Sequence, residues 1–266
     1  MLPVARVPVS RVRGSAPGNG ARTSAAGHYA AVMSEVGAGI TDLVLGTALV
    51  GCAARLRWTP GVHRYWALIW WSAGAAAFAG AAHHLVFNHS PRAADLSWVA
   101  VGVLVAVALS YLLAATATAT LDERWAVLVI RARIAGLLAY AAWMGTVGIG
   151  RTAPLVLCES VTMATIVGLW CYGWYVGHPE AGRVLVAMAV LAVSAVFFVL
   201  PAWIYPTSLG LDARSLQHLA QIPGVLLLTR VVVDAAHPTP ALASPGGAAP
   251  PALARFRSAG RVDRQG

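Results

Sequence analysis

The sequence predicts an all-α, polytopic membrane protein that folds as a seven-transmembrane-helix bundle. Of its 266 residues, 58% are hydrophobic and 11% are charged, whereas soluble domains contain about 45–50% apolar and about 25% charged residues. Seven apolar segments follow one another, each near the scale of about 20 residues that a helix needs to cross a bilayer. Tryptophans lie near the segment ends, where their rings prefer the membrane interface: Trp66, Trp98, Trp125, Trp143, Trp174 and Trp203.

The predicted helices follow these apolar segments in chain order. They cover residues 37–54, 66–87, 96–116, 134–147, 153–176, 184–205 and 214–233. The fourth segment is short, so we expect its helix to extend backwards through residues 125–130. Arg131 and Arg133 would then extend their long side chains to the headgroups.

The segments on either side of the bundle are predicted to be disordered. Residues 1–32 are rich in Pro, Gly, Ala and Arg and have neither an apolar period nor the apolar stretch of a signal peptide. Met33 is therefore an alternative start of the chain, and residues 33–234 form the predicted transmembrane domain. Residues 235–266 form a basic tail that we expect to contact anionic lipid.

Charge and composition exclude several classes of function. The net charge of +9 comes from arginines in the tails and between apolar segments, without the basic, aromatic face typical of nucleic-acid binding. Lysine is absent, which excludes a retinal Schiff base. The three cysteines lie within apolar segments and are expected to be free thiols.

The arginines also predict the orientation, because cytoplasmic loops carry an excess of positive charge. We expect a bacterial inner-membrane protein with its N-terminus outside and its C-terminus in the cytoplasm; the arginines before Met33 weaken this orientation if that segment is retained. The cytoplasmic side has Arg55, Arg57, Arg64, Arg124, Arg131, Arg133, Arg183, Arg230, Arg255, Arg257, Arg261 and Arg264, against Arg92, Arg151 and Arg214 outside.

Ionisable residues within the apolar segments are candidate functional residues, because a charge inside a membrane is costly. On the predicted topology they share one depth near the outer face. We predict that four helices bring them to a single pocket, with Asp42 and Glu159 as catalytic groups and with metal ligands among His83, His84 and His218.

The last helix has the densest polar pattern. Arg214, His218 and Gln221 share one helical face, with Ser215 beside them, and we assign Arg214, Ser215 and Gln221 to substrate binding. Pro223 is expected to kink this helix. Gly80, one turn before His83, would allow a neighbouring helix to approach closely.

Each of these residues also has a structural interpretation. Asp42 could bridge or cap helices, and Glu159 could form an ion pair with Arg151 or Arg214. Adjacent histidines point in different directions, so at most one of His83 and His84 is expected to be a ligand.

Three short segments carry a resemblance to a known family: Thr41-Asp42, the stretch from Gly80 to His84, and the stretch from Ser215 to Gln221. They resemble a bacterial seven-helix family that is similar to the superfamily of alkaline ceramidases and progestin/adiponectin receptors. The resemblance implies a seven-helix bundle that binds zinc through histidines of the second and seventh helices and hydrolyses lipid amides.

Carried over to this chain, the resemblance implies His83 or His84 and His218 as zinc ligands. The position four before His218, where the superfamily has a histidine, is Arg214. Asp42 or Glu159 would have to be the third ligand, since catalytic zinc sites use three protein ligands and a water.

Three functions remain open at this point. The first is a zinc-dependent hydrolase of a lipid amide or ester. The second is a membrane sensor or transporter with a His, Asp and Glu proton relay, and the third is a haem-binding electron carrier. Membrane lipids and a small lipid-like ligand are the expected partners, while the oligomeric state is left open.

Overall fold

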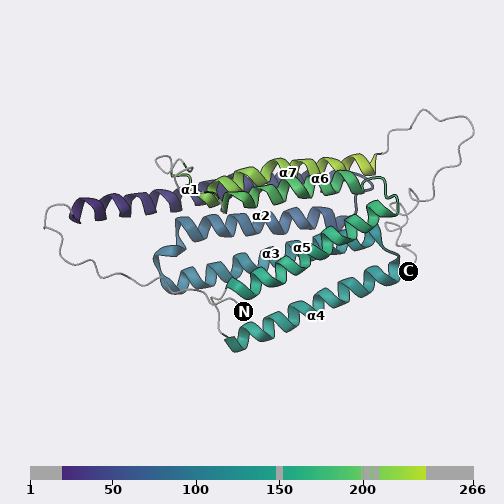
Figure 1. The fold of residues 1–266 in the computed structure, drawn as a ribbon, viewed down its shortest axis with the longest axis horizontal. Helices are drawn as coiled ribbons and strands as arrows, with labels where there is room; N and C mark the ends of the chain where they lie inside the picture. Colours follow the sequence, from purple (N-terminus) through teal and green to yellow (C-terminus); the bar gives the residue numbers. More distant parts are fainter. Residues whose placement is uncertain (1–19, 148–151, 199, 201–204, 206–209, 238–266) are drawn as a thin grey trace, which may run out of the picture.

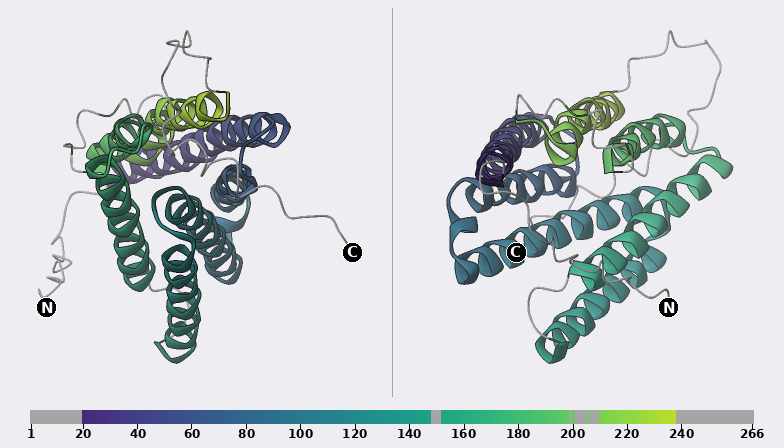
Figure 2. Two further views of the ribbon diagram at one scale, coloured as in Figure 1. Left: turned by 90° about the vertical axis from the view of Figure 1, so that its right-hand side faces the viewer. Right: turned by 60° about the vertical axis from the view of Figure 1, so that its left-hand side comes forward.

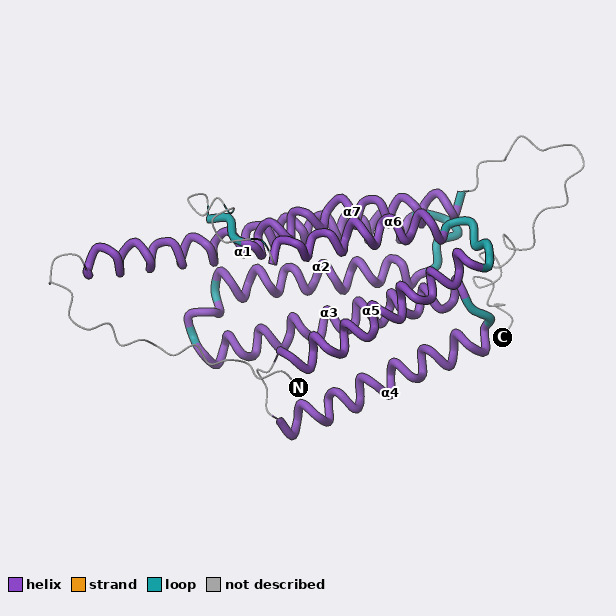
Figure 3. Tube along the Cα trace, in the orientation of Figure 1, coloured by secondary structure: helices purple, strands orange, loops and turns teal. Residues whose placement is uncertain are grey.

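In the computed structural model, the described residues are 20–147, 152–198, 200, 205 and 210–237, and they form helices without strands (Figures 1 and 3). The elements are α1 (Gly20–Trp58), α2 (Arg64–Leu85), the 3-10 helix η1 (Phe87–His89), α3 (Pro91–Thr120), α4 (Glu123–Val147), α5 (Thr152–Tyr175), α6 (Ala181–Val193), the 3-10 helix η2 (Ser194–Phe198) and α7 (Ala213–Ala236).

The all-helical prediction is confirmed for the described residues, and each of the seven apolar segments contains a helix, the sixth being described as α6 and η2 up to residue 198. The fourth helix begins at Glu123, so its expected backward extension is present. The prediction that residues 1–32 form no helix or strand is wrong for residues 20–32, which belong to α1. Alanine, the strongest helix former, recurs through this stretch. The remainder of both expected disordered tails, 1–19 and 238–266, lies outside the described residues.

Six helices form a closed ring, and the fourth lies outside it. Around the ring α1 packs against α2, α2 against α3, α3 against α5, α5 against α6, α6 against α7, and α7 against α1. Helix α4 packs on the outside of α3, and both views of Figure 2 place it at the edge of the molecule. The ring therefore encloses a space that α4 does not reach.

Four of the described helices contain stretches long and apolar enough to cross a membrane: Val32–Trp58, Pro91–Thr120, Glu123–Trp143 and Ala213–Ala236. Their outward faces expose large apolar side chains, among them Leu43, Val103, Leu138 and Leu226. Extended apolar surfaces of this kind mark membrane or protein contact. The fold is thus suited to a membrane environment.

The apolar core fills the half of the ring around the ends of α1 and α7. Leu56, Trp170 and Leu228 are each at most 1% exposed there, and they belong to one continuous cluster. The indole nitrogen of Trp170 donates a hydrogen bond of 3.0 Å to Thr116 Oγ1, so this buried polar group is satisfied.

At the opposite end, α1 meets the start of α7 at close range. Gly210 has φ +70°, a conformation that favours glycine. A Cβ atom on Gly37 would overlap the carbonyl oxygen of Gly210. The Ser34 hydroxyl donates to Asp212 Oδ2 at 2.8 Å, and Asp212 Oδ1 accepts the backbone N–H of Ser215, capping α7.

Gly37→Ala is therefore expected to destabilise the fold, because the new methyl group forces α1 away from backbone that cannot rotate aside. Overpacking of this kind costs about 1–3 kcal/mol. Gly51→Ala on the same helix is the matched control, since a Cβ there meets no atom within 4 Å. Thermal unfolding in detergent should show a lower midpoint for Gly37→Ala only; equal midpoints for both variants would contradict this close contact.

Candidate functional site

A cavity of about 1570 Å³ lies inside the six-helix ring. Residues of α1, α2, α3, α5, α6 and α7 line it, whereas the described residues of α4 do not. Its volume exceeds the range of about 300–1,000 Å³ typical of small-molecule pockets. A large internal site is therefore available.

The lining of the cavity changes from polar to apolar along the bundle axis. Polar lining residues come near the middle of α1, early in α3 and α7 and late in α2. Because these helices alternate in direction, the polar side chains gather at one end. That end has Asp42, His83, His84, Asp95, Arg214 and His218, while the remainder is lined by residues such as Leu49, Ile69, Leu112, Met163, Met188 and Leu228.

Two histidine–carboxylate contacts join α1 to its neighbours at the polar end. His84 Nδ1 of α2 lies 2.7 Å from Glu35 Oε2, which also accepts a 3.0 Å hydrogen bond from Asn88. His218 Nδ1 of α7 lies 3.1 Å from Asp42 Oδ1. Because the two carboxylates are seven residues apart, they occupy one face of α1, two turns from each other.

Gly80 makes room for the Asp42 carboxylate. A Cβ on Gly80 would lie 2.5 Å from Asp42 Oδ2, so the expected close approach of a helix at Gly80 is confirmed, with α1 as the neighbour. Asp42 is 6% exposed and His84 is 4% exposed. Both groups are thus held away from solvent and depend on their partners.

His83 faces a different neighbour from His84. Its Nδ1 lies 2.8 Å from Ser97 Oγ of α3, and the Ser97 hydroxyl donates to the carbonyl oxygen of Ala93 at 2.7 Å. Because a hydroxyl has a single hydrogen, Ser97 accepts from His83. The two adjacent histidines line the cavity but bind α3 and α1 respectively.

The three histidines do not fit a common metal centre. Within the described ranges, no three His, Cys, Asp or Glu side chains gather in a way that could hold a metal ion, whereas a catalytic zinc site needs three protein ligands. Each Nδ1 instead faces an oxygen of a different residue: Ser97, Glu35 or Asp42. The predicted zinc site at His83 or His84, His218 and a carboxylate does not match this arrangement.

The prediction that Glu159 converges on the same pocket is wrong. Its carboxylate oxygens lie 3.2 and 3.3 Å from Arg133 Nη2, at the seam where α4 meets α3 and α5. Glu159 pairs with Arg133, and Arg214 contacts Glu35; Arg151 lies outside the described residues. Glu159 thus points to the outer side of the ring.

Arg133 is buried, at 9% exposed, and does not extend away from the bundle as expected. It lies about 15 Å along α4 from Glu123, and its guanidinium faces α3 and α5. All of its donor groups are engaged: Nε with Ser110 Oγ, Nη1 with Thr162 Oγ1 and Cys158 Sγ, and Nη2 with the Ala106 carbonyl oxygen and Glu159. The guanidinium thus links α4 to α3 and α5.

The start of α7 supplies the remaining polar lining. Arg214, Gln217, His218 and Gln221 face the cavity, and Arg214 Nη1 lies 4.0 Å from Glu35 Oε1. Ser215, expected to contact substrate, is fully buried and its hydroxyl donates to Asp212 Oδ1. Ser215 therefore belongs to the helix cap.

Asp212 is ionised in this cap. Burial opposes its ionisation, but hydrogen bonds from the Ser215 backbone N–H and from the hydroxyls of Ser34 and Ser215 lower its pKa below the ordinary value. The negative charge lies at the N-terminus of α7, where it interacts favourably with the helix dipole.

Residues 38–237 match DUF6962, a family of unknown function. The chain belongs to this family. No curated protein and no solved structure matches the chain. The matched range of this DUF6962 protein includes Asp42, His84 and His218. Glu35 lies just before the first matched residue. The similarity to ceramidases stays a prediction.

Four polar residues of the DUF6962 protein that form contacts or line the cavity were not assigned a site role from the sequence: Glu35, Asn88, Gln217 and Arg133. Gln217 was detectable, because it lies three residues after Arg214 and four before Gln221, on the same helical face. Glu35 lies seven residues before Asp42 and therefore on the same helical face, but nothing in the spacing indicates its partner. Arg133 was assigned to the interface because the sequence does not show that Ser110, Thr162 and Glu159 of neighbouring helices surround it.

Arg133→Met should destabilise the protein by about 3–5 kcal/mol, because it leaves the Glu159 carboxylate buried without its partner. Arg133→Met/Glu159→Met should recover most of this loss, since neither charge then remains. Thermal unfolding of the two variants and the wild type provides the measurement. A double variant as unstable as the single one would show that the ion pair does not dominate this cluster.

Proposed function

We propose that this DUF6962 protein is a membrane sensor or transporter in which protonation of two histidine–carboxylate pairs is coupled to ligand binding in the internal cavity. One observation carries the proposal: Glu35–His84 and Asp42–His218 lie on one face of α1 and connect it to α2 and α7 at 2.7 and 3.1 Å. The packing of α1 then depends on where the protons reside.

The chemistry of such pairs suits a proton-driven switch. A protonated histidine beside a carboxylate forms an ion pair, which is stronger in a low-dielectric interior than in water. Adding a proton to Asp42, or removing one from His218, leaves a single buried charge, and breaking a buried pair in this way costs about 3–5 kcal/mol. The Glu35–His84 pair contributes less, because the Glu35 side chain is 38% exposed. Changes of that size are sufficient to shift a two-state helix arrangement.

The cavity provides the ligand site that a sensor or transporter needs. Asp42, His84 and His218 line it directly, so a molecule bound there would meet the same groups that hold α1 to its neighbours. Ligand binding and proton binding would then affect each other, because linkage between two sites is reciprocal.

Seven membrane crossings are part of this proposal. Helices α2 and α5 have 22 and 24 residues, which reaches the length of about 20 residues needed for a crossing. Helix α6 continues as apolar structure into η2, over Ala181–Phe197. The proposed location is the bacterial inner membrane, with the polar end of the cavity near the outer face.

The arginines support this orientation after one correction. Arg133 no longer counts as a loop residue, because it is buried between helices. Arg55 and Arg57 lie in the last turn of α1, Arg64 begins α2, and Arg124 lies at the start of α4. All four remain on the proposed cytoplasmic side, in agreement with the excess of positive charge found there.

A reporter enzyme that is active only in the cytoplasm, fused after residue 235, is expected to be active in cells, and the same reporter inserted near Asp95 is expected to be silent. The reverse pattern would overturn the proposed orientation and place the polar end of the cavity on the cytoplasmic side.

Asp42→Asn should abolish most of the pH response of the protein, because the amide cannot form an ion pair with His218. Hydrogen exchange of α1 and α7 in lipid nanodiscs, followed between pH 5 and pH 8, should change by at least about tenfold in the wild type, as expected when about 1.4 kcal/mol of pairing energy is lost. Asp95→Asn is the control, since Asp95 lines the cavity without an ion-pair partner in the described part of the chain. No pH response in the wild type would refute the relay.

A lipid hydrolase is the second candidate. The contact of His218 Nδ1 with Asp42 leaves Nε2 unassigned, and an imidazole held by a carboxylate in this way is the arrangement of a general base. Hydrolysis of a long-chain amide or ester by the nanodisc preparation, lost in Asp42→Asn and in His218→Gln, would establish this activity. A preparation that responds to pH without releasing product favours the sensor or transporter.

A further inference from the structure

We propose that Gln217 and Gln221 recognise the neutral polar group of an amphipathic ligand whose chain occupies the apolar part of the cavity. The group is a hydroxyl or carboxamide, which both donates and accepts hydrogen bonds. This inference rests on the proposed ligand-binding function and extends it by naming the class of ligand.

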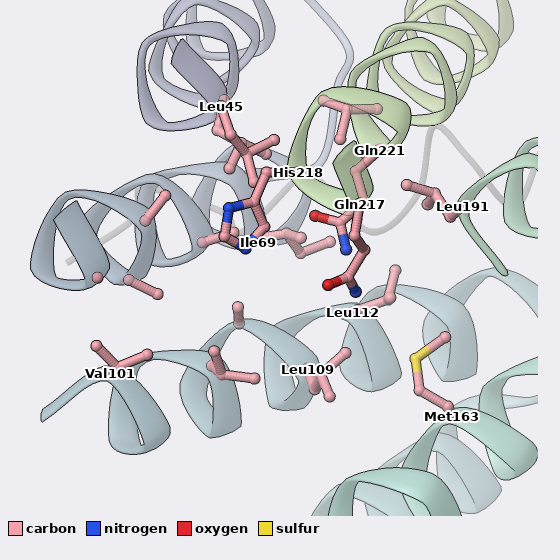
Figure 4. A pocket seen from close by; sticks show the side chains of 18 of the residues that line it. Leu45, Ile69, Val101, Leu109, Leu112, Met163, Leu191, Gln217, His218 and Gln221 are labelled. Atoms are coloured by element: carbon pink, nitrogen blue, oxygen red, sulfur yellow. The ribbon is translucent and has the colours of Figure 1, made fainter. Parts of the chain in front are cut away.

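The two glutamines project together into the cavity. They are four residues apart on α7 and so lie one above the other on the same helical face. Figure 4 shows both carboxamides extending away from α7 towards Leu109 and Leu112 of α3, with His218 turned to the side of Leu45 and Ile69. The amides thus enter the apolar region, whereas His218 remains with the ion pairs.

Neither carboxamide has a hydrogen-bond partner among the described residues, although both side chains line the cavity. Both side chains are partly buried, so their amide groups are open to the cavity and are available to a ligand. A ligand that supplies a donor and an acceptor would satisfy both, because each carboxamide has two N–H donors and an acceptor oxygen.

The surroundings favour a ligand group without formal charge. At this end Asp42 contacts His218 at 3.1 Å and Arg214 lies 4.0 Å from Glu35, whereas Asp95, which has no ion-pair partner among the described residues, is exposed near the start of α3. Leu109, Leu112 and Met163 line the cavity opposite the amides and offer no counter-ion. A charged group placed between them would lose its hydration without compensation, whereas a hydroxyl or amide would not.

The remaining space fits an apolar chain. Along α7 the lining continues from Gln221 to Val225 and Leu228, a further distance of about 10 Å. Leu185 and Met188 of α6 and Ile69 of α2 also line the cavity. Methionine adapts to flexible apolar ligands because of its unbranched chain, so the site suits an alkyl chain better than a rigid ring system.

Photoaffinity labelling in nanodiscs tests this recognition. Four probes share one diazirine-bearing alkyl chain and differ in the head group: hydroxyl, carboxamide, carboxylate or ammonium. The hydroxyl and carboxamide probes are expected to label peptides of α3, α5 and α7 that line the cavity, and excess unlabelled alcohol or amide should compete. Gln217→Met/Gln221→Met should reduce this labelling about tenfold, which corresponds to about 1.4 kcal/mol of lost hydrogen bonding.

Leu226→Met is the matched control, because Leu226 is on the same helix and 53% exposed; it should leave labelling unchanged. The glutamine variant is expected to unfold at the same or a higher temperature, since it removes two unpartnered amides. A single Gln221→Met variant provides a milder change if the double variant is poorly produced.

Equal labelling by all four head groups, or labelling that is insensitive to the glutamine substitutions, would overturn this inference while leaving the proton relay intact. Labelling confined to lipid-facing residues would overturn it as well. Failure of the proposed function is separate and would appear as a wild-type protein without a pH response in hydrogen exchange.

Discussion

The contact of α1 with α2 and α7 through two histidine–carboxylate pairs is the interaction on which the organisation of the site depends. Glu35 and Asp42 lie within a candidate membrane span, where an unpaired charge is costly. Each carboxylate meets a histidine of a different helix, and Gly80 leaves the space that Asp42 needs. These contacts close one end of the helical ring and give the cavity its polar end.

The need to pair a buried charge also explains the cluster around Arg133 and Glu159, on the other side of α3. Arg133 enters the α3–α5 seam from α4 and is neutralised by Glu159, while serine, threonine and backbone oxygens take its other N–H groups. Helix α4 is thereby attached to a ring in which it does not take part. The protein thus separates two roles: one set of paired charges faces the cavity, and the other holds a peripheral helix.

The helices could be predicted from the sequence, because apolar length is a property of a single segment. The seven-residue spacing of Glu35 and Asp42 likewise places them on one face of a helix. Which helix each face meets depends on packing between distant segments. Glu159 therefore has another neighbour than expected, and the partners of His83 and His84 could not be assigned. No local feature of the sequence indicates that α4 lies outside the ring.

The histidine side chains provide the most direct test of the central claim, which is that His84 pairs with Glu35 and His218 with Asp42 on α1, and that the two histidines are not ligands of a shared metal. The measurement is the 15N NMR spectrum of the imidazole nitrogens in lipid bilayers. The account predicts that Nδ1 of both rings carries a hydrogen donated to a carboxylate, and that Asp42→Asn shifts the signals of His218 far more than those of His84. Ring nitrogens of His84 and His218 that are coordinated to one metal ion, or signals of His218 that are unchanged by Asp42→Asn, would contradict it.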